Sequence, residues 1–141
     1  MQNFELLKQV GKIKKPVILK RGMCCSINEF KLASEYIACE GNSDIIMCER
    51  GIRTFETATR NTLDISCIAI LKNETKFPII ADISHSLGRK DISLQIAKAV
   101  KALGSDGIMV EVHNNPKSAL SDSLQQMDLL EFKSFMGELF K

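Results

Sequence analysis

Short apolar runs recur four times along the chain and predict four buried β-strands. They begin at Pro16, Asp44, Phe77 and Gly107, at intervals of about thirty residues, the length of one strand-and-helix unit. The fourth run extends through Val112. Near-continuous apolar character is typical of parallel strands that are covered on both faces. The pattern therefore predicts a parallel sheet.

Amphipathic stretches with a helical repeat lie before, between and after these runs. In the first, apolar side chains at positions 4, 6, 7 and 10 form one stripe behind Asn3, which is suited to cap a helix. Ser26 and Glu29 have the spacing of a capping box at the start of the second. The expected helices cover residues 3–10, 26–40, 63–72, 93–103 and 127–140, with polar loops at 51–61 and 86–90.

An initial helix followed by four βα units places the chain in the α/β class with parallel βα repeats. Such a chain forms either a doubly wound sheet or half of a (β/α)8 TIM barrel. We expect residues 1–141 to be a single domain, because this length is sufficient to bury one core. The fingerprint GxGxxG and the P-loop pattern are both absent, which argues against a nucleotide-binding Rossmann or P-loop domain.

Ionisable residues follow all four predicted strands. Because the carboxyl ends of parallel strands meet on one face, these side chains are expected to converge. Lys and Arg suit a phosphate or carboxylate, whereas His, Glu and Asp form a ligand set for manganese, iron, zinc or cobalt. The combination predicts a phosphorylated-anion site with a divalent metal. Its candidates are Lys20, Arg21, Glu49, Arg50, Arg53, Asp82, His85, Glu111, His113 and Asp122.

Taken singly, several of these residues also have a structural interpretation. Lys20 could be an ordinary solvated lysine, and His85 could be a hydrogen-bonded structural histidine. Glu111 is harder to explain in this way, because a carboxylate within an apolar run is costly to bury without a partner. His113 stands beside a turn, and we expect a structural or supporting role for it.

Charge and cysteine content narrow the function classes. The formal net charge of +2 is too small to indicate a nucleic-acid or membrane partner. The five cysteines are irregularly spaced and none forms a CxxC pair, which argues against a disulfide framework and a zinc or redox motif. No signal-peptide pattern or membrane-length apolar run is present. We expect a cytoplasmic protein with reduced thiols.

The strand ends also belong to segments that carry a family resemblance, such as Asp82-Ile83-Ser84-His85. These segments are residues 1–7, 15–22, 40–42, 48–56, 60–64, 82–85, 107–113 and 119–122. Along this collinear match the chain resembles the carboxyl-terminal half of a 3-deoxy-D-arabino-heptulosonate 7-phosphate (DAHP) synthase. The resemblance is to the branch of that family that is related to 3-deoxy-D-manno-octulosonate 8-phosphate (KDO8P) synthase. Segments 19–22, 52–56 and 60–64 favour the heptulosonate enzyme.

The resemblance implies an activity and a set of site residues. DAHP synthases are (β/α)8 barrels that condense phosphoenolpyruvate with erythrose 4-phosphate, the first step of the shikimate pathway to aromatic amino acids. By resemblance, Lys20 is catalytic and binds phosphoenolpyruvate together with Arg50 and Arg53. The implied metal ligands are His85, Glu111 and Asp122, three of the family's four.

The chain departs from the family pattern at three places. The fourth ligand of the family is a cysteine on the first barrel strand, and we expect the segment that carries it to precede Met1. Ile83 stands where relatives usually have Pro. Ser123 and Leu124 stand where Gly-Pro usually follows the third ligand, so the loop that positions Asp122 is expected to differ.

Three functional hypotheses follow. The first is a half-barrel of a DAHP synthase whose chain has little or no activity without the amino-terminal half. The second is a non-catalytic module, because open sheet edges near residues 16–19 and 107–112 invite strand pairing. Such a module would pair with a second copy, forming a homo-oligomer, or with a separate amino-terminal half. The third is a KDO8P synthase.

Overall fold

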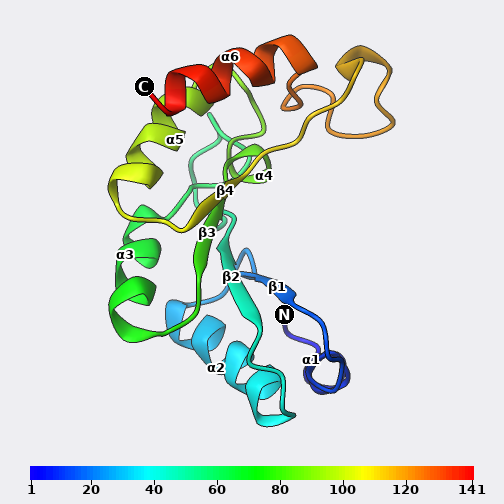
Figure 1. Cartoon of the computed structure of the whole chain (residues 1–141), viewed down its shortest axis with the longest axis vertical. Coiled ribbons are helices and arrows are strands. Elements are labelled where there is room, and N and C mark those ends of the chain that lie inside the picture. Colours follow the sequence, from blue (N-terminus) through cyan, green and yellow to red (C-terminus); the bar gives the residue numbers. More distant parts are fainter.

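Four parallel strands form one sheet, and their order in space follows their order in the sequence (Figure 1). The computed structural model describes all residues from 1 to 141. The strands are β1 (Val17–Lys20), β2 (Ile45–Glu49), β3 (Ile79–Asp82) and β4 (Gly107–Met109). The helices are α1 (Phe4–Gly11), α2 (Ile27–Cys39), α3 (Ile65–Glu74), α4 (Ile83–Leu87), α5 (Ser93–Ala102) and α6 (Leu129–Leu139), with a 3-10 turn, η1, at Pro116–Ser118. The predicted parallel βα repeats are confirmed.

Capping residues set the starts of the helices. The side chain of Asn3 accepts a hydrogen bond from the backbone of Leu6 at 3.0 Å, as predicted. Ser26 and Glu29 form the predicted capping box of α2. A second capping box, at Asp128, starts α6 at Leu129, two residues later than the sequence predicts.

Three of the helices form a layer on one face of the sheet. Figure 1 shows α2, α3 and α5 together on one side of the strands, whereas α1 lies by itself below β1, at the edge of the sheet. The core lies between the sheet and these helices, and its fully buried members include Phe30, Ile37, Met47, Ile68 and Ile79. A doubly wound sheet carries helices on both faces, whereas a barrel carries them outside only. The arrangement is therefore that of half a (β/α)8 barrel.

The fourth strand is shorter than the sequence predicts. Residues 107–112 form one apolar run, yet β4 ends at Met109. The adjacent strand β3 has already ended at Asp82, so the next residues have no strand beside them. Instead, the Glu111 N–H donates to Ser84 Oγ at 2.9 Å, and the Met127 N–H donates to the Glu111 carbonyl at 3.0 Å. Glu111 thus lies beyond the strand and is half-buried.

The segment after β3 also differs from the prediction. The sequence predicts a loop over residues 86–90, whereas Ser86 and Leu87 complete the short helix α4. Asp82 caps this helix by accepting a hydrogen bond from the His85 N–H, and Gly88 ends it with a left-handed φ of 67°. None of the helices combines the length and apolar character needed to cross a membrane.

Candidate metal and anion site

The carboxyl ends of the strands bring the predicted site residues together. Lys20 is the last residue of β1, and His85 lies in α4 directly after β3. Glu111 follows β4, and Asp122 comes from the long loop before α6. One ligand atom from each of His85, Glu111 and Asp122 lies within 4.8 Å of the others. The structure therefore unites the three residues that the sequence marks as metal ligands.

A buried carboxylate, that of Asp82, holds the site together. Its Oδ2 atom lies 2.7 Å from Lys20 Nζ and 2.8 Å from His85 Nδ1. Burial by itself would raise the pKa of Asp82, but the hydrogen bonds from Lys20 and from the His85 N–H outweigh it, and the pKa is lowered. Asp82 is thus an anion that fixes a cation and a histidine with one oxygen.

The contact with Asp82 determines which nitrogen of His85 is available. An ionised carboxylate can only accept hydrogen bonds, so the hydrogen of a neutral imidazole lies on Nδ1. The other nitrogen, Nε2, then carries a lone pair and lies 3.4 Å from Glu111 Oε1. A carboxylate that orients a histidine in this way is typical of metal sites.

Two further side chains, which the sequence-based reasoning missed, hold the two candidate carboxylate ligands. Gln125 is buried and donates from Nε2 to Glu111 Oε2 at 2.6 Å. Arg60 donates to Asp122 Oδ1 at 2.7 Å. Asp122 itself has a left-handed φ of 55°, which aspartate tolerates better than most residues. Arg60 lies in a matching family segment, but no signal in the sequence marks Gln125 as buried.

The donor set fits a divalent cation. One imidazole nitrogen and two carboxylates suit manganese, iron, zinc or cobalt, and His85 Nε2 lies close to a carboxylate oxygen of Glu111. No cysteine belongs to this group. Cys48, the cysteine at the end of β2, is fully buried, and burial raises the pKa of its thiol to about 12.

The two candidate substrate arginines follow β2. Arg50 comes directly after the strand and is half-buried, whereas Arg53 is exposed. The backbone N–H of Arg53 donates to the Met23 carbonyl at 2.8 Å, and an antiparallel bridge between Ile52 and Thr62 supports the same loop. Neither arginine is among the ion-paired cations of the structure. Both stay candidates for an anionic substrate.

Three of the ionisable strand-end residues have a structural role instead. The Nη1 atom of Arg21 lies 2.9 Å from Glu49 and 2.9 Å from Asp64, and Arg21 and Glu49 are both buried. Arg21 is therefore not available as a substrate-binding cation, because it is buried and its Nε and Nη1 groups donate to partners inside the protein. His113 accepts a hydrogen bond from the backbone of Asn115 at 3.0 Å, which agrees with the expected structural role.

Comparison with known proteins identifies the family. The model of the DAHP synthetase I family matches residues 1–141. The chain belongs to this family. It is 53% identical to the phospho-2-dehydro-3-deoxyheptonate aldolase of Thermotoga maritima, over 99% of this chain and 41% of that protein. A 2-dehydro-3-deoxyphosphooctonate aldolase of Legionella pneumophila is 26% identical, over 94% of this chain and 52% of the relative.

Solved structures agree with this assignment. The crystal structure of the Thermotoga maritima DAHP synthase superposes with a TM-score of 0.96 at 52% identity, over 99% of this chain and 41% of that one. A truncated form of the same DAHP synthase also gives a TM-score of 0.96, and the present chain covers 53% of it. The chain thus spans about half, or less, of the DAHP synthetase relatives that it matches.

Proposed function

We propose that this chain supplies the metal-binding and phosphoenolpyruvate-binding half of a DAHP synthase. The complete enzyme would condense phosphoenolpyruvate with erythrose 4-phosphate. The observation that carries the proposal is the single oxygen of Asp82 that contacts both Lys20 and His85. Through this oxygen, the candidate substrate cation and the candidate metal ligand have a fixed separation.

Each side chain has a distinct proposed task. The Lys20 ammonium uses one of its three hydrogens on Asp82, and the others are free for the carboxylate or phosphate of phosphoenolpyruvate. Arg50 and Arg53 would complete the anion site, because a guanidinium group binds such groups with two parallel hydrogen bonds. His85, Glu111 and Asp122 would hold the divalent metal. When bound, the metal would polarise the aldehyde carbonyl of the second substrate.

Sequence identity favours the heptulosonate reaction over the octulosonate reaction. The relative named as the heptonate enzyme is 53% identical, whereas relatives named as octonate enzymes are 26% to 30% identical. The substrate other than phosphoenolpyruvate is therefore proposed to be erythrose 4-phosphate.

We expect the chain by itself to have little or no activity. Three metal ligands are present in the group, and no cysteine joins them. Consumption of phosphoenolpyruvate by the purified chain, with erythrose 4-phosphate and Mn²⁺, tests this expectation. Turnover comparable to that of the Thermotoga maritima enzyme, measured in parallel, would contradict the expectation.

Metal binding tests the site itself. Titration with Mn²⁺, followed by calorimetry or by the loss of its free spin-resonance signal, should give one site per chain. His85→Ala should abolish that binding. His113→Ala is the matched control, because His113 is the second histidine of the chain and lies outside the ligand group. Equal loss in both variants would disprove the assignment of His85.

Phosphoenolpyruvate binding tests the cation. Lys20→Met should weaken binding at least tenfold, since removal of a charge-assisted hydrogen bond costs about 1.5–3 kcal/mol. Lys15→Met removes an exposed lysine five positions earlier and should leave the affinity unchanged. Unchanged affinity in Lys20→Met would show that Lys20 is an ordinary solvated lysine.

A further inference from the structure

Both edges of the sheet present backbone groups without partners. The N–H groups of Val17 and Arg21 donate to the carbonyls of Asp44 and Cys48, so the backbone groups of Ile18 and Lys20 point away from the sheet. In the fourth run, the Glu111 N–H points toward the β3 side, where it meets Ser84. Alternation along a strand therefore directs Ile108, Val110 and Val112 toward the open side.

The open edge at the fourth run extends beyond the strand. Neither the N–H nor the carbonyl of Val110 or Val112 takes part in a hydrogen bond within the chain. These residues continue the direction of β4 without a neighbour on their outer side. An extended, apolar edge of this kind favours pairing with another strand.

Barrel geometry predicts which residues of the two edges would face each other. Across the sheet, four residues lie side by side in register: Lys20, Cys48, Ile80 and Gly107. On going once around an eight-stranded barrel, the register shifts by about eight residues, which is called the shear. Each of two equal halves therefore accounts for a shift of about four residues. Gly107 of one copy would then face Pro16 of a second copy, and Glu111 would face Lys20. A shift in the opposite direction would place Lys20 beside Leu103. Leu103 lies at the end of the helix α5 and not in a strand, so this register is rejected.

This register matches the directions of the free backbone groups. With Val110 opposite Leu19, the Val110 N–H can donate to the Ile18 carbonyl, and the Lys20 N–H can donate to the Val110 carbonyl. The Val112 N–H can donate to the Lys20 carbonyl in the same way. A shift by an odd number of residues would turn these groups away from each other. Two-fold symmetry would create the same ladder at both junctions.

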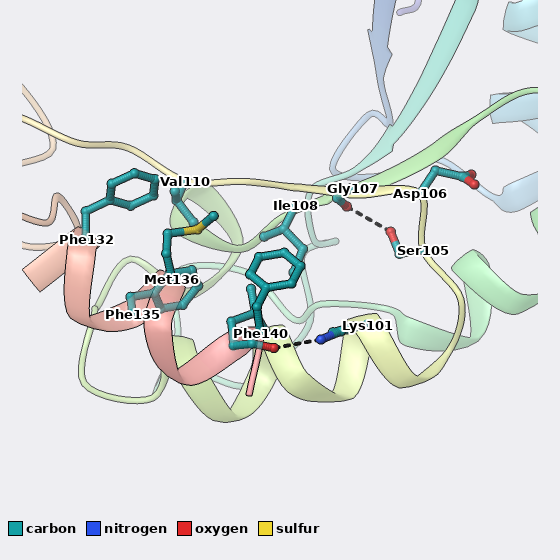
Figure 2. Close-up of a pocket in the computed structure, with 11 residues that line it drawn as sticks. Lys101, Ser105, Asp106, Gly107, Ile108, Val110, Phe132, Phe135, Met136 and Phe140 are labelled. Atoms are coloured by element: carbon teal, nitrogen blue, oxygen red, sulfur yellow. Dashed lines mark hydrogen bonds between the residues drawn. The ribbon is translucent and has the colours of Figure 1, made fainter.

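Apolar surface flanks each of the two edges. Figure 2 shows Phe132, Phe135, Met136 and Phe140 of the α6 region facing Ile108 and Val110 across a groove of about 270 Å³. At the other edge, apolar side chains of α1 and β1 line a groove of about 390 Å³. These grooves lie beside the strands that would pair, so closure would bring the apolar surfaces of α1 and α6 together.

We infer that two copies of this chain close into one eight-stranded parallel barrel. The chain covers 53% of the truncated Thermotoga maritima enzyme, so a second copy supplies about as many residues as that relative has beyond the match. In the closed barrel, Lys20 of the second copy lies next to Glu111, and each metal group borders on both chains. The inference does not depend on catalysis.

The mass of the purified chain in solution tests the inference first. Sedimentation equilibrium should give a mass of about 31 kDa, twice the 15.7 kDa of one chain. Hydrogen exchange should show protected amides at Ile18, Lys20, Val110 and Val112, whereas the amide of the exposed Leu120 should exchange freely. A monomer, or a dimer in which these four amides exchange like that of Leu120, would overturn the inference. If the barrel forms only with a separate amino-terminal half, the purified chain should sediment as a monomer.

A pair of matched variants locates the interface. Ile18 is 48% exposed and shares the inner face of β1 with Lys20, so Ile18→Lys would place a charge inside the closed barrel. Leu32 of α2 is 46% exposed, does not belong to either edge strand and provides the control Leu32→Lys. Ile18→Lys should raise the dimer dissociation constant at least tenfold, and Leu32→Lys should not change it. Circular dichroism checks that both variants fold, and a folded Ile18→Lys dimer of unchanged affinity overturns the inference.

Discussion

The ammonium of Lys20 lies 2.7 Å from the carboxylate of Asp82, although 62 positions separate the two residues in the sequence. The contact connects the end of β1 to the end of β3, and the same carboxylate oxygen holds His85. In this arrangement, a residue that contacts neither the proposed metal nor the proposed substrate positions the groups for both.

Asp82→Asn should weaken both binding functions of the site. The amide keeps the shape of the side chain but loses the charge that fixes Lys20 and selects the tautomer of His85. We expect Mn²⁺ affinity to fall about 10- to 100-fold, as is usual when the partner of a ligating histidine is lost. Phosphoenolpyruvate affinity should fall as well. Calorimetric titrations measure both.

Asp91→Asn is the control for this variant, because Asp91 is exposed and pairs with Arg89 at the protein surface. It should leave both affinities unchanged. If Asp82→Asn lowered stability but left Mn²⁺ and phosphoenolpyruvate binding intact, Asp82 would be a structural residue only.

Gln125→Leu should weaken metal binding through Glu111. The substitution removes the 2.6 Å hydrogen bond that orients this carboxylate, and we expect Mn²⁺ affinity to fall about tenfold. Gln126 offers a matched control, since it is also buried but donates to the Ser121 carbonyl and not to a ligand. Gln126→Leu should therefore spare the metal affinity. A similar loss in both variants would indicate a general disturbance of the loop.

Arg21→Met should destabilise the fold strongly. It leaves the fully buried Glu49 without its cation, and loss of one partner of a buried pair costs about 3–5 kcal/mol. Urea unfolding measures the change, and Arg89→Met, at an exposed ion pair, should leave the midpoint almost unchanged. The double variant Arg21→Met/Glu49→Leu should recover part of the loss, because it removes the unpaired charge. No recovery would mean that packing of Arg21, and not its charge, is what matters.

Stability should depend on pH in the acid range. The pKa values of Asp82 and Asp64 are lowered below the usual 3.8, because hydrogen bonds from basic and hydroxyl partners outweigh the effect of burial. A lowered pKa favours the folded state above the unfolded value of about 3.9, and this contribution is lost as the pH falls through the folded pKa. The free energy of unfolding should therefore be steady near neutrality and decline below about pH 4.

Removal of either carboxylate should reduce that acid dependence. Asp64→Asn and Asp82→Asn each take away one group that binds a proton on acid unfolding, so the slope of stability against pH should become shallower. Urea midpoints between pH 3 and 7 measure the slope. An unchanged slope in both variants would assign the acid sensitivity to other groups.

The sequence by itself determined the class of the fold and the candidate metal ligands. The apolar runs and the caps at Asn3 and Ser26 depend on local preferences, so they could be interpreted without the tertiary structure. The positions of His85, Glu111 and Asp122 followed from the family segments, and the structure brings these residues together.

Only the tertiary structure decided the roles that depend on neighbours far away in the sequence. Strand ends place ionisable residues on one face, but burial and pairing decide which of them are free. Arg21 and Glu49 neutralise each other inside the protein, whereas Lys20 stays half-exposed beside Asp82. Gln125 supports Glu111 only because the loop before α6 folds back over the strand ends. Such contacts have no local sequence signal, because they form only when strands and loops that are distant in the sequence come together at the end of the sheet.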